Sequence, residues 1–191
     1  MKLSEGDLPK QDIYAIMTKS EVKNRMSNKQ KEDFNSIVQD IIDNQRFNKL
    51  KKELHHGITR YDHSYRVAKW THIIGTIFHM KNIENTTRAA LLHDFYINED
   101  LIGNNSVKKL GLHPEIALKN SLNYYRLDNI QQDIIKSHMF PCNLTVPKYK
   151  ESWLVSSVDK IVGAYEMLRF KTSLYAGISF LFLFELLKIS R

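Results

Sequence analysis

The stretch "RAALLHDFYIN", residues 88 to 98, places a histidine and an aspartate side by side where an apolar helical pattern ends. Alanine and leucine at this spacing predict a helix whose apolar face runs out at His93 and Asp94. Imidazole and carboxylate groups are both common metal ligands. The pair therefore suggests a metal site, and that hypothesis requires further ligands elsewhere in the chain.

The composition is that of an ordinary globular protein, with 42% hydrophobic and 26% charged residues among 191. This length suits one domain with appendages and is sufficient to bury a core. The single cysteine, Cys142, excludes an internal disulfide framework and is typical of a reducing compartment. Because the N-terminus also lacks the apolar core of a secretory signal, the sequence predicts a cytoplasmic protein.

The charge balance is basic, with 28 Lys and Arg against 21 Asp and Glu, a formal net charge of +7. A basic surface attracts phosphate-bearing molecules in general. The basic residues form no long run, and the densest patch, "NKLKKELHH" at residues 48–56, fits a solvated helix face. The charge therefore favours a phosphate-bearing substrate without indicating specific binding of a nucleic acid.

Helical periodicity dominates the chain, and convincing strand alternation is absent, which predicts an all-α fold. Helices are expected over residues 27–47, 48–57, 61–80, 85–94, 113–125, 127–140 and 149–168. Expected boundary residues are Ser27 or Asn28 and Asn85 or Thr86 as N-caps, Gly57 as a stop, Pro114 in a first turn and Pro141 as an end. Residues 98–111 have the most loop-like composition, and their position after Asp94 makes them a candidate lid.

The C-terminal segment "LYAGISFLFLFELLKISR", residues 174–191, is apolar on nearly every side of a helix. Its continuous apolar run is shorter than the roughly 20 residues of a membrane-spanning helix, and Glu185 interrupts it. Three interpretations stay open: a core or homodimer-interface helix, a peripheral membrane anchor, or a short or tilted span. A solvated, free-standing helix is the arrangement that this composition excludes.

Further metal-ligand residues recur at the predicted helix ends. The candidates are His63, His93, Asp94, His113, His138 and Asp159. Four of these positions fall at helix ends, which would let ligands from several helices converge. Asp159 lies inside the apolar stretch "LVSSVDKIVGAY", where a buried carboxylate is costly unless a cation or hydrogen bonds compensate its charge.

This ordered set resembles the HD-domain superfamily of metal-dependent phosphohydrolases. The resemblance rests on "HSYRVA" around His63, "AALLHDF" around the His-Asp pair and "LVSSVDKI" around Asp159. It covers roughly residues 46–168 and is closest in character to small, mostly uncharacterised bacterial HD hydrolases. It implies an HD-type helical bundle over residues 46–170, with a helical appendage at 1–45 and an apolar helix at 171–191.

The resemblance also implies the role of each ligand. His63, His93, Asp94 and Asp159 would hold one divalent ion, Asp94 would bridge to a second, and His113 and His138 would complete that second site. Such nitrogen and oxygen ligands accept Mn, Fe, Zn, Ni, Co or Mg, and the identity of the ion stays open. His93 and Asp94 would lie at the catalytic centre, where two ions clamp a phosphate and activate a water.

The function implied is hydrolysis of a small phosphate ester, a nucleotide-like phosphodiester or pyrophosphate. Arg66, one helical turn after His63, and Lys160, next to Asp159, are candidate substrate-binding residues. An alternative function is a metal-containing module that binds or senses a nucleotide without turnover. Peripheral membrane contact or a homodimer through residues 174–191 is compatible with either function.

Overall fold

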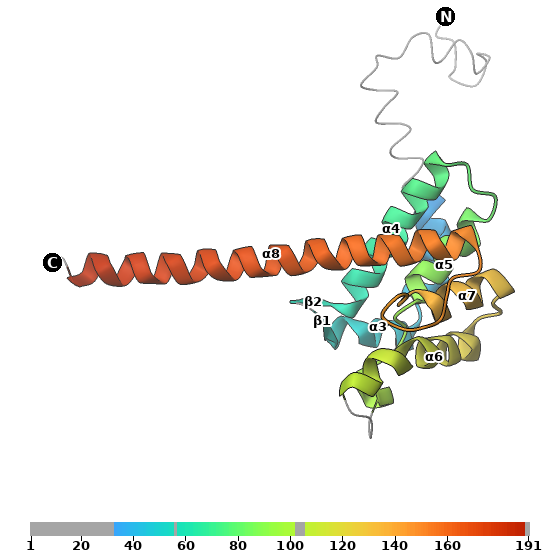
Figure 1. Ribbon diagram of the computed structural model, residues 1–191, viewed down its shortest axis with the longest axis horizontal. Helices are drawn as coiled ribbons and strands as arrows, with labels where there is room; N and C mark the ends of the chain where they lie inside the picture. The colour runs from blue at the N-terminus through green and yellow to red at the C-terminus, as the bar shows by residue number, and fades with distance from the viewer. Residues whose placement is uncertain (1–32, 56, 102–105, 190–191) are drawn as a thin grey trace, which may run out of the picture. The chain divides into compact units, whose positions relative to one another are not determined.

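The structure, a computed structural model, describes residues 33–55, 57–101 and 106–189, with side chains given except at 55, 106–110 and 174–189. The chain divides into two compact units, residues 1–37 and 38–191. A helix at residues 33–42 continues across this boundary, and the elements below belong to the second unit (Figure 1). Most of the appendage expected at 1–45, with its caps Ser27 and Asn28, lies outside the described residues.

The helix that was expected over residues 48–57 forms only in part: residues 48–52 are helical, and a short hairpin follows in place of the rest. Helix α3 (Gln45–Asn48) and the 3-10 turn η1 (Lys49–Lys52) are followed by strands β1 (Leu54–His55) and β2 (Ile58–Thr59), which pair antiparallel. Gly57 has a φ of 85° and lies in the turn between the strands. A glycine in the left-handed conformation is equally suited to a tight turn and to a helix end, so Gly57 does not distinguish the two. Strands of two residues are also too short to show an alternating hydrophobic pattern in the sequence.

Helices α4 (Arg60–Ile77) and α5 (Ile83–Leu92) form an antiparallel pair that agrees with the predicted helices to within a few residues. The Thr59 hydroxyl accepts a hydrogen bond from the backbone N–H of Asp62 and caps α4. The expected caps of α5 were wrong, because Asn82 is its N-cap residue. Thr86 is already inside the helix, where its hydroxyl donates to the carbonyl of Asn82.

Much of the predicted loop 98–111 is helical. The 3-10 turn η2 (Asn98–Leu101) is followed, after residues outside the description, by helix α6 (Ser106–Tyr124). Pro114 therefore lies inside α6 rather than in its first turn, although a proline there forfeits a backbone hydrogen bond. The buried ring of His113 packs against Tyr96, and this contact helps to hold the residue before the proline in a helix. The part of the candidate lid at residues 102–105 lies outside the described residues.

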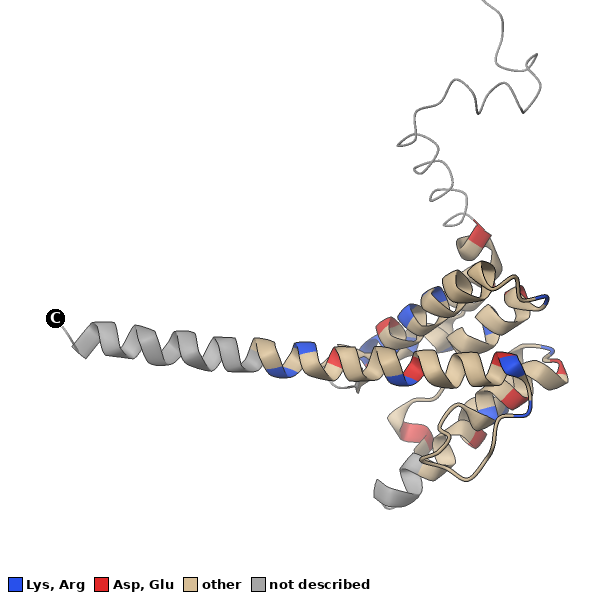
Figure 2. Cartoon of the chain, turned by 45° about the horizontal axis from the view of Figure 1, so that its top comes forward, with Lys and Arg blue, Asp and Glu red and all other residues tan. Residues whose placement is uncertain are grey.

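Helices α7 (Asn129–Ser137) and α8 (Lys150–Ile189) complete the fold. A capping box starts α7: Asp128 accepts from the backbone N–H of Gln131, and the Gln131 side chain accepts from that of Asp128. The expected helices 149–168 and 171–191 form one continuous helix. Figure 2 shows charged residues spaced along the described part of α8.

The core of the second unit lies where α5 packs between α4 and α7 while α8 runs along α4 and α7. Its fully buried apolar side chains come from every one of these helices; they include Val67, Leu91, Leu92, Ile134, Ile135 and Val155. The described chain is thus mostly helical, which confirms the all-α prediction, with β1 and β2 as its two short strands. Among the described residues, no helix combines the length and the apolar character needed to cross a membrane.

Candidate metal centre

All six residues predicted as metal ligands meet between five helices. The fourth residue of α4 is His63, while His93 and His138 are the C-cap residues of α5 and α7. Asp94 follows His93 directly, and Asp159 projects from α8. His113 was expected at a helix N-terminus, but it comes from within α6. These side chains are buried or, for Asp159, largely buried, so the cluster is shielded from bulk water.

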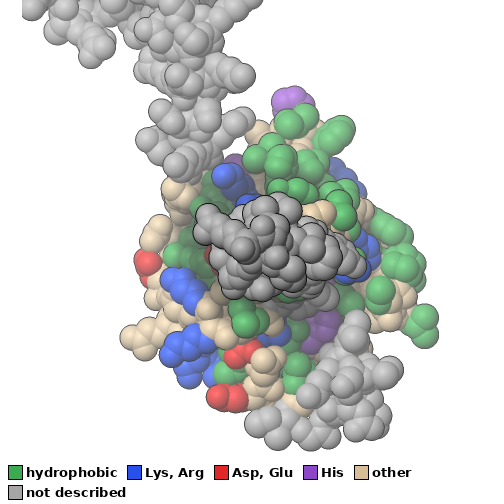
Figure 3. All heavy atoms as spheres, turned by 90° about the vertical axis from the view of Figure 1, so that its left-hand side faces the viewer, with side chains coloured by type: hydrophobic (Ala, Val, Ile, Leu, Met, Phe, Trp, Pro, Cys, Tyr) green, Lys and Arg blue, Asp and Glu red, His purple; other side chains and the backbone are tan. Residues whose placement is uncertain are grey.

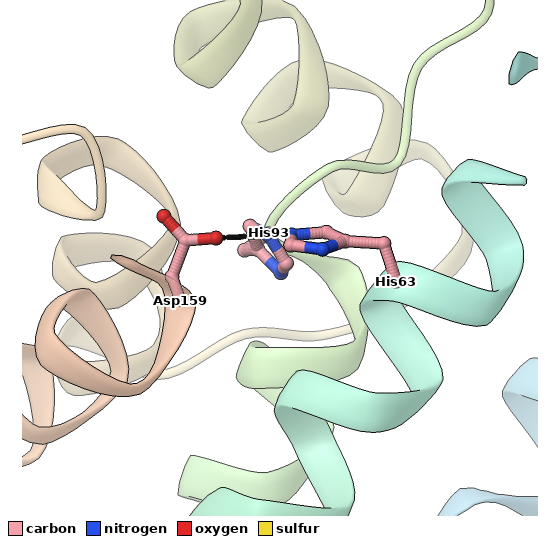
Figure 4. Close-up of side chains that lie close together, drawn as sticks. All are labelled: His63, His93 and Asp159. Carbon is pink, nitrogen blue, oxygen red and sulfur yellow. Dashed lines mark hydrogen bonds and ion pairs between the residues drawn. The ribbon is translucent and has the colours of Figure 1, made fainter. Parts of the chain in front are cut away.

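The first group of ligand atoms comes from His63, His93 and Asp159 (Figure 4). Oδ1 of Asp159 lies 3.0 Å from Nε2 of His63 and 3.5 Å from Nε2 of His93. The ligand atoms of all three residues lie within 4.8 Å of one another. Three donors from three helices therefore converge on a volume of the size that one metal ion needs.

The second group is built around Asp94. Its Oδ2 lies 3.8 Å from Nε2 of His93, and its Oδ1 lies 3.5 Å from Nε2 of His113 and 3.6 Å from Nε2 of His138. Nε2 of His113 and Nε2 of His138 are 3.1 Å apart. Asp94 thus faces the first group through one carboxylate oxygen and the remaining two histidines through the other.

Backbone carbonyls orient two of the rings. Nδ1 of His93 lies 2.7 Å from the carbonyl of Ala90, and Nδ1 of His138 lies 2.8 Å from that of Ile135. A carbonyl only accepts, so each Nδ1 carries the hydrogen. In the neutral ring the lone pair is then on Nε2, which points into the cluster. A hydrogen bond from the other ring nitrogen is the usual support of a metal-ligating histidine.

Two atoms in the centre of the cluster are buried and lack a hydrogen-bond partner within the described part of the chain: Nε2 of His93 and Oδ1 of Asp94. A buried polar atom without a partner costs about 1–3 kcal/mol. A lone pair and a carboxylate oxygen cannot satisfy each other, because both are acceptors. A cation satisfies both, and the residues present therefore fit a metal ion.

The charges of the cluster act strongly on one another. Burial alone would raise the pKa of Asp94, but the four surrounding histidines hold it well below the ordinary value. Burial lowers the pKa of His63, yet hydrogen bonds to Asp159 and Glu166 raise it to about 10. Burial together with the neighbouring His93 lowers the pKa of His138 to about 3. Without a metal ion, the ionised carboxylates are therefore balanced by a protonated His63, and a divalent cation held by these residues would replace that proton.

Glu166 is a member of the site that sequence analysis missed. Its Oε2 accepts a hydrogen bond from Nδ1 of His63 at 2.8 Å, while its Oε1 accepts one from Arg66. Only 1% of its side chain is exposed. The signal in the sequence was the heptad spacing from Asp159, which places both carboxylates on one face of α8. Glu166 therefore orients His63 so that Nε2 faces Asp159.

Tyr96 was also not predicted as a site residue. Its ring lies 5.1 Å from that of His113, centroid to centroid, and the guanidinium of Arg60 covers the ring at 3.9 Å. Nη1 of Arg60 also donates to the carbonyl of Tyr96 at 2.9 Å. Burial raises the pKa of the Tyr96 hydroxyl, which keeps it neutral. Arg60 thus holds the Tyr96 ring in place, and the His113 ring packs against it.

The two candidate substrate-binding residues have partners in the structure. Arg66 donates to Glu166 and has a third of its side chain exposed. Nζ of Lys160 donates to the carbonyls of His138 and Ser156 and to the Ser156 hydroxyl. The ammonium of Lys160 therefore ties α8 to the end of α7 next to His138, and this structural role accounts for all three of its hydrogens.

The ligand set consists of imidazole nitrogens and carboxylate oxygens, since the one cysteine, Cys142, is exposed and takes no part. Such sets suit Mn, Fe, Zn, Ni or Co, and several of these ions would fit the same residues. Comparisons of the chain with protein-family models, with curated proteins and with solved structures found no match. The chemistry of the cluster is therefore the guide to its function.

Proposed function

We propose that the chain is a metal-dependent phosphohydrolase of the HD type, an HD helical bundle that hydrolyses a small phosphate ester. The observation that carries the proposal is the position of Asp94. One of its oxygens faces His93 and the other faces His113 and His138, which is how a carboxylate is placed to bridge two metal ions. The motif resemblance in "HSYRVA", "AALLHDF" and "LVSSVDKI" supports the same assignment.

Each residue of the cluster has a distinct task in this proposal. His63, His93 and Asp159 would hold the first ion with Asp94, while His113 and His138 would hold the second. Bound ions would supply Lewis acidity, which lowers the pKa of a water molecule and offsets the charge that develops on phosphoryl oxygens. The backbone-held imidazoles of His93 and His138 keep their donor atoms in place, so little reorganisation accompanies the reaction.

The nucleotide-like substrate class is what the resemblance to the HD superfamily implies, and the charge and the two proposed ion positions are compatible with it. Two adjacent cations favour a substrate with two negatively charged or bridging oxygens, such as a nucleotide-like phosphodiester or a pyrophosphate. The net charge of +7 would attract such an anion to the protein surface. No covalent intermediate on the protein is part of the proposal, because the imidazoles and carboxylates of the cluster would be engaged as metal ligands.

The test is hydrolysis of a panel of phosphodiesters, pyrophosphates and phosphomonoesters by the full chain reconstituted with Mn²⁺, Fe²⁺, Zn²⁺, Ni²⁺, Co²⁺ or Mg²⁺ in turn. Asp94→Asn should lower turnover by at least about a hundredfold, because it removes one anionic ligand from both ion positions. The matched control is Asp43→Asn, which alters an exposed carboxylate and should leave turnover unchanged. Turnover by Asp94→Asn at the wild-type rate would contradict the proposal.

A binding or sensing module gives a different result in the same assay. It would bind a nucleotide at a stoichiometry of one per chain, in a metal-dependent way, and would release no product over hours. Because binding is followed by calorimetry and product by chromatography, the two functions are separated on a single preparation. Metal-dependent binding without product across the whole panel would replace hydrolysis by sensing.

A further inference from the structure

An apolar groove lies between α4 and α8, on the side of this helix pair where Arg66 reaches Glu166. Its volume is about 900 Å³. The lining residues are Asp62, Tyr65, Arg66, Lys69, Trp70, Ile73, Ile74, Val158, Ile161, Val162, Tyr165 and Arg169. Ile161 is 68% exposed and Trp70 is 49% exposed. Figure 3 shows hydrophobic side chains, with cationic ones among them, exposed on the face seen along α8.

This exposure is unusual for the residues concerned. Trp70 and Ile73 of α4 are large apolar side chains, yet they line an open groove. On α8, residues 167–173 are all exposed, although the Phe170 ring still lies against Gly57 of the hairpin. A contiguous apolar surface flanked by charged residues is typical of a protein interface. The groove is therefore a candidate docking site, and the described residues of the second unit leave it open.

The C-terminal part of α8 has matching properties. Residues 174–187 carry one charge, that of Glu185, and contain no Lys or Arg. They form about 21 Å of helix at 1.5 Å per residue, while the α8 edge of the groove, residues 158–169, is about 18 Å long. The rim of the groove carries Arg66, Lys69 and Arg169 against one acid, Asp62, so a segment without cations meets no repulsion there.

The same chain cannot fill its own groove with this segment. Helix α8 is continuous from Lys150 to Ile189, and its residues 158–169 form one wall of the groove. A continuous helix does not turn back upon itself, because each residue adds 1.5 Å along a single axis. The apolar segment can therefore reach an equivalent groove only on another molecule.

We propose that the chain forms a two-fold symmetric dimer in which residues 174–187 of each copy occupy the groove between α4 and α8 of the other. The two α8 helices run antiparallel, and the interface is isologous, so each copy gives one segment and receives one. Both unusual features of the molecule, an open apolar groove and a helix that is apolar on nearly all sides, are then buried by the same contact.

The lengths fix the register of this dimer. Residues 163–164 are the middle of the groove along α8, and residues 180–181 are the middle of the apolar segment. Antiparallel helices that place these midpoints opposite each other have their two-fold axis near residue 172. Thr172 and Ser173, which are exposed, would then lie at the centre of the helix pair.

The first test is sedimentation velocity of the full chain over a range of concentrations. The wild type should be a dimer, and deletion of residues 174–191 should give a monomer. Ile161→Glu should raise the dissociation constant at least about tenfold, because it places a charge in the groove at a residue exposed enough for the monomer to tolerate it. The control, Leu144→Glu, alters an apolar residue that is 95% exposed and outside the groove, and should remain dimeric.

Mixing the two defective chains separates this arrangement from a contact between the tails alone. The Ile161→Glu chain keeps its segment, and the truncated chain keeps its groove, so together they restore one of the two contacts. Heterodimers should therefore form in the mixture more readily than homodimers of either chain. If the mixture behaves as the sum of its parts, or if Ile161→Glu dimerises like the wild type, the groove is not the receptor.

The second test is cross-linking in a Cys142→Ser background. Tyr165→Cys is combined with one further cysteine placed in turn at residues 178–181, which together cover every side of one helical turn. In one chain, residues 165 and 179 are about 21 Å apart along α8, too far for a disulfide. The proposed register places residue 165 opposite residue 179 of the partner, so at least one of these variants should form a covalent dimer.

The control for cross-linking is Tyr165→Cys alone in the same background. Its two symmetry-related cysteines would be about 21 Å apart in the proposed dimer and should not form a bridge. Three results would each overturn the proposal. They are a monomeric wild type, efficient cross-linking of this single-cysteine variant, and a dimer that forms only in the presence of phospholipid vesicles. None of these results bears on the hydrolysis assay, so the proposed function would stand.

Discussion

Nε2 of His113 and Nε2 of His138 lie 3.1 Å apart, and both lie within 3.6 Å of Oδ1 of Asp94. Two imidazole nitrogens at this distance either share one hydrogen or ligate a common cation. Nδ1 of His138 already donates to the carbonyl of Ile135, so a neutral His138 presents a lone pair to His113. Replacing a histidine of this pair is therefore the most direct test for a second metal ion in the cluster.

Replacement of His113 should remove one of two metal ions. The wild type, purified without chelators and reconstituted anaerobically, should contain about two ions per chain, and His113→Ala about one. Elemental analysis of the two proteins measures this directly. The control, His79→Asn, removes an exposed imidazole at a residue with a φ of 51°, a conformation that Asn tolerates, and should retain the wild-type content.

The metal content also distinguishes the outcomes. One ion in both the wild type and His113→Ala would mean that His113 only packs against Tyr96, and that the centre holds a single ion. No ion in the wild type after reconstitution would contradict the metal centre as a whole.

Replacement of Glu166 should weaken metal binding although Glu166 is not among the proposed ligands. Glu166→Gln keeps the size of the side chain but removes the charge that holds Nδ1–H of His63 and pairs with Arg66. Loss of such a support typically costs about 10–100-fold in metal affinity. Competition with a chromophoric chelator measures the affinity, with Zn²⁺ as the probe.

The control for this variant is Glu115→Gln, which changes an exposed glutamate paired with Lys136 on the surface. It should bind Zn²⁺ like the wild type. If Glu166 has only a structural role, Glu166→Gln should lower the melting temperature of the metal-free protein and leave its affinity for Zn²⁺ unchanged. That pattern would refute the positioning role.

The six-residue cluster could be predicted from sequence because its members carry local signals. His93 and Asp94 interrupt an apolar pattern, and Asp159 stands alone in an apolar helix. Such residues are expensive to bury without partners, so their presence in apolar contexts indicates a site. Their meeting place follows once their helices pack together.

Glu166 and the path of the chain around Pro114 could not be predicted in the same way. A glutamate on a helix is usually solvated, and only the packing of α4 against α8 shows that Glu166 lies in their seam beside His63. Local rules place a proline at the start of a helix, whereas the contact between His113 and Tyr96 is made over a distance in sequence. Both misses arise where tertiary contacts outweigh local preference.

Replacement of glycine by alanine should have opposite effects at two positions. Gly57 has a φ of 85°, and a Cβ there would collide with the ring of Phe170, so Gly57→Ala should lower the free energy of unfolding by about 1–3 kcal/mol. Gly111 lies in α6 with open space around its Cβ position, so Gly111→Ala should raise it by about 0.5–1 kcal/mol. Urea unfolding followed by circular dichroism compares the two, and equal effects would contradict the turn geometry at Gly57.

Replacement of Asp100 should lower the free energy of unfolding by an amount that depends on pH. Oδ1 of Asp100 accepts from Arg46 at 2.6 Å, and Oδ2 accepts from the backbone N–H of Ile97 and from Asn120, both at 3.0 Å. Burial alone would raise the pKa of Asp100, but these donors outweigh burial and lower it. Asp100→Asn places an amide NH₂ against groups that only donate, so it should cost about 1–3 kcal/mol at neutral pH.

The sign of the pH effect follows from the lowered pKa. Because the folded chain favours the ionised carboxylate more than the unfolded chain does, the contribution of Asp100 is fully present above its unfolded pKa of about 3.9. It is lost as the pH falls through the lower folded value. The difference in free energy of unfolding between the wild type and Asp100→Asn should therefore be constant from about pH 7 to 5 and shrink below about pH 4. Urea unfolding at pH 7, 5 and 3.5 measures it, and a difference that grows towards acid would mean that Asp100 is protonated in the folded chain.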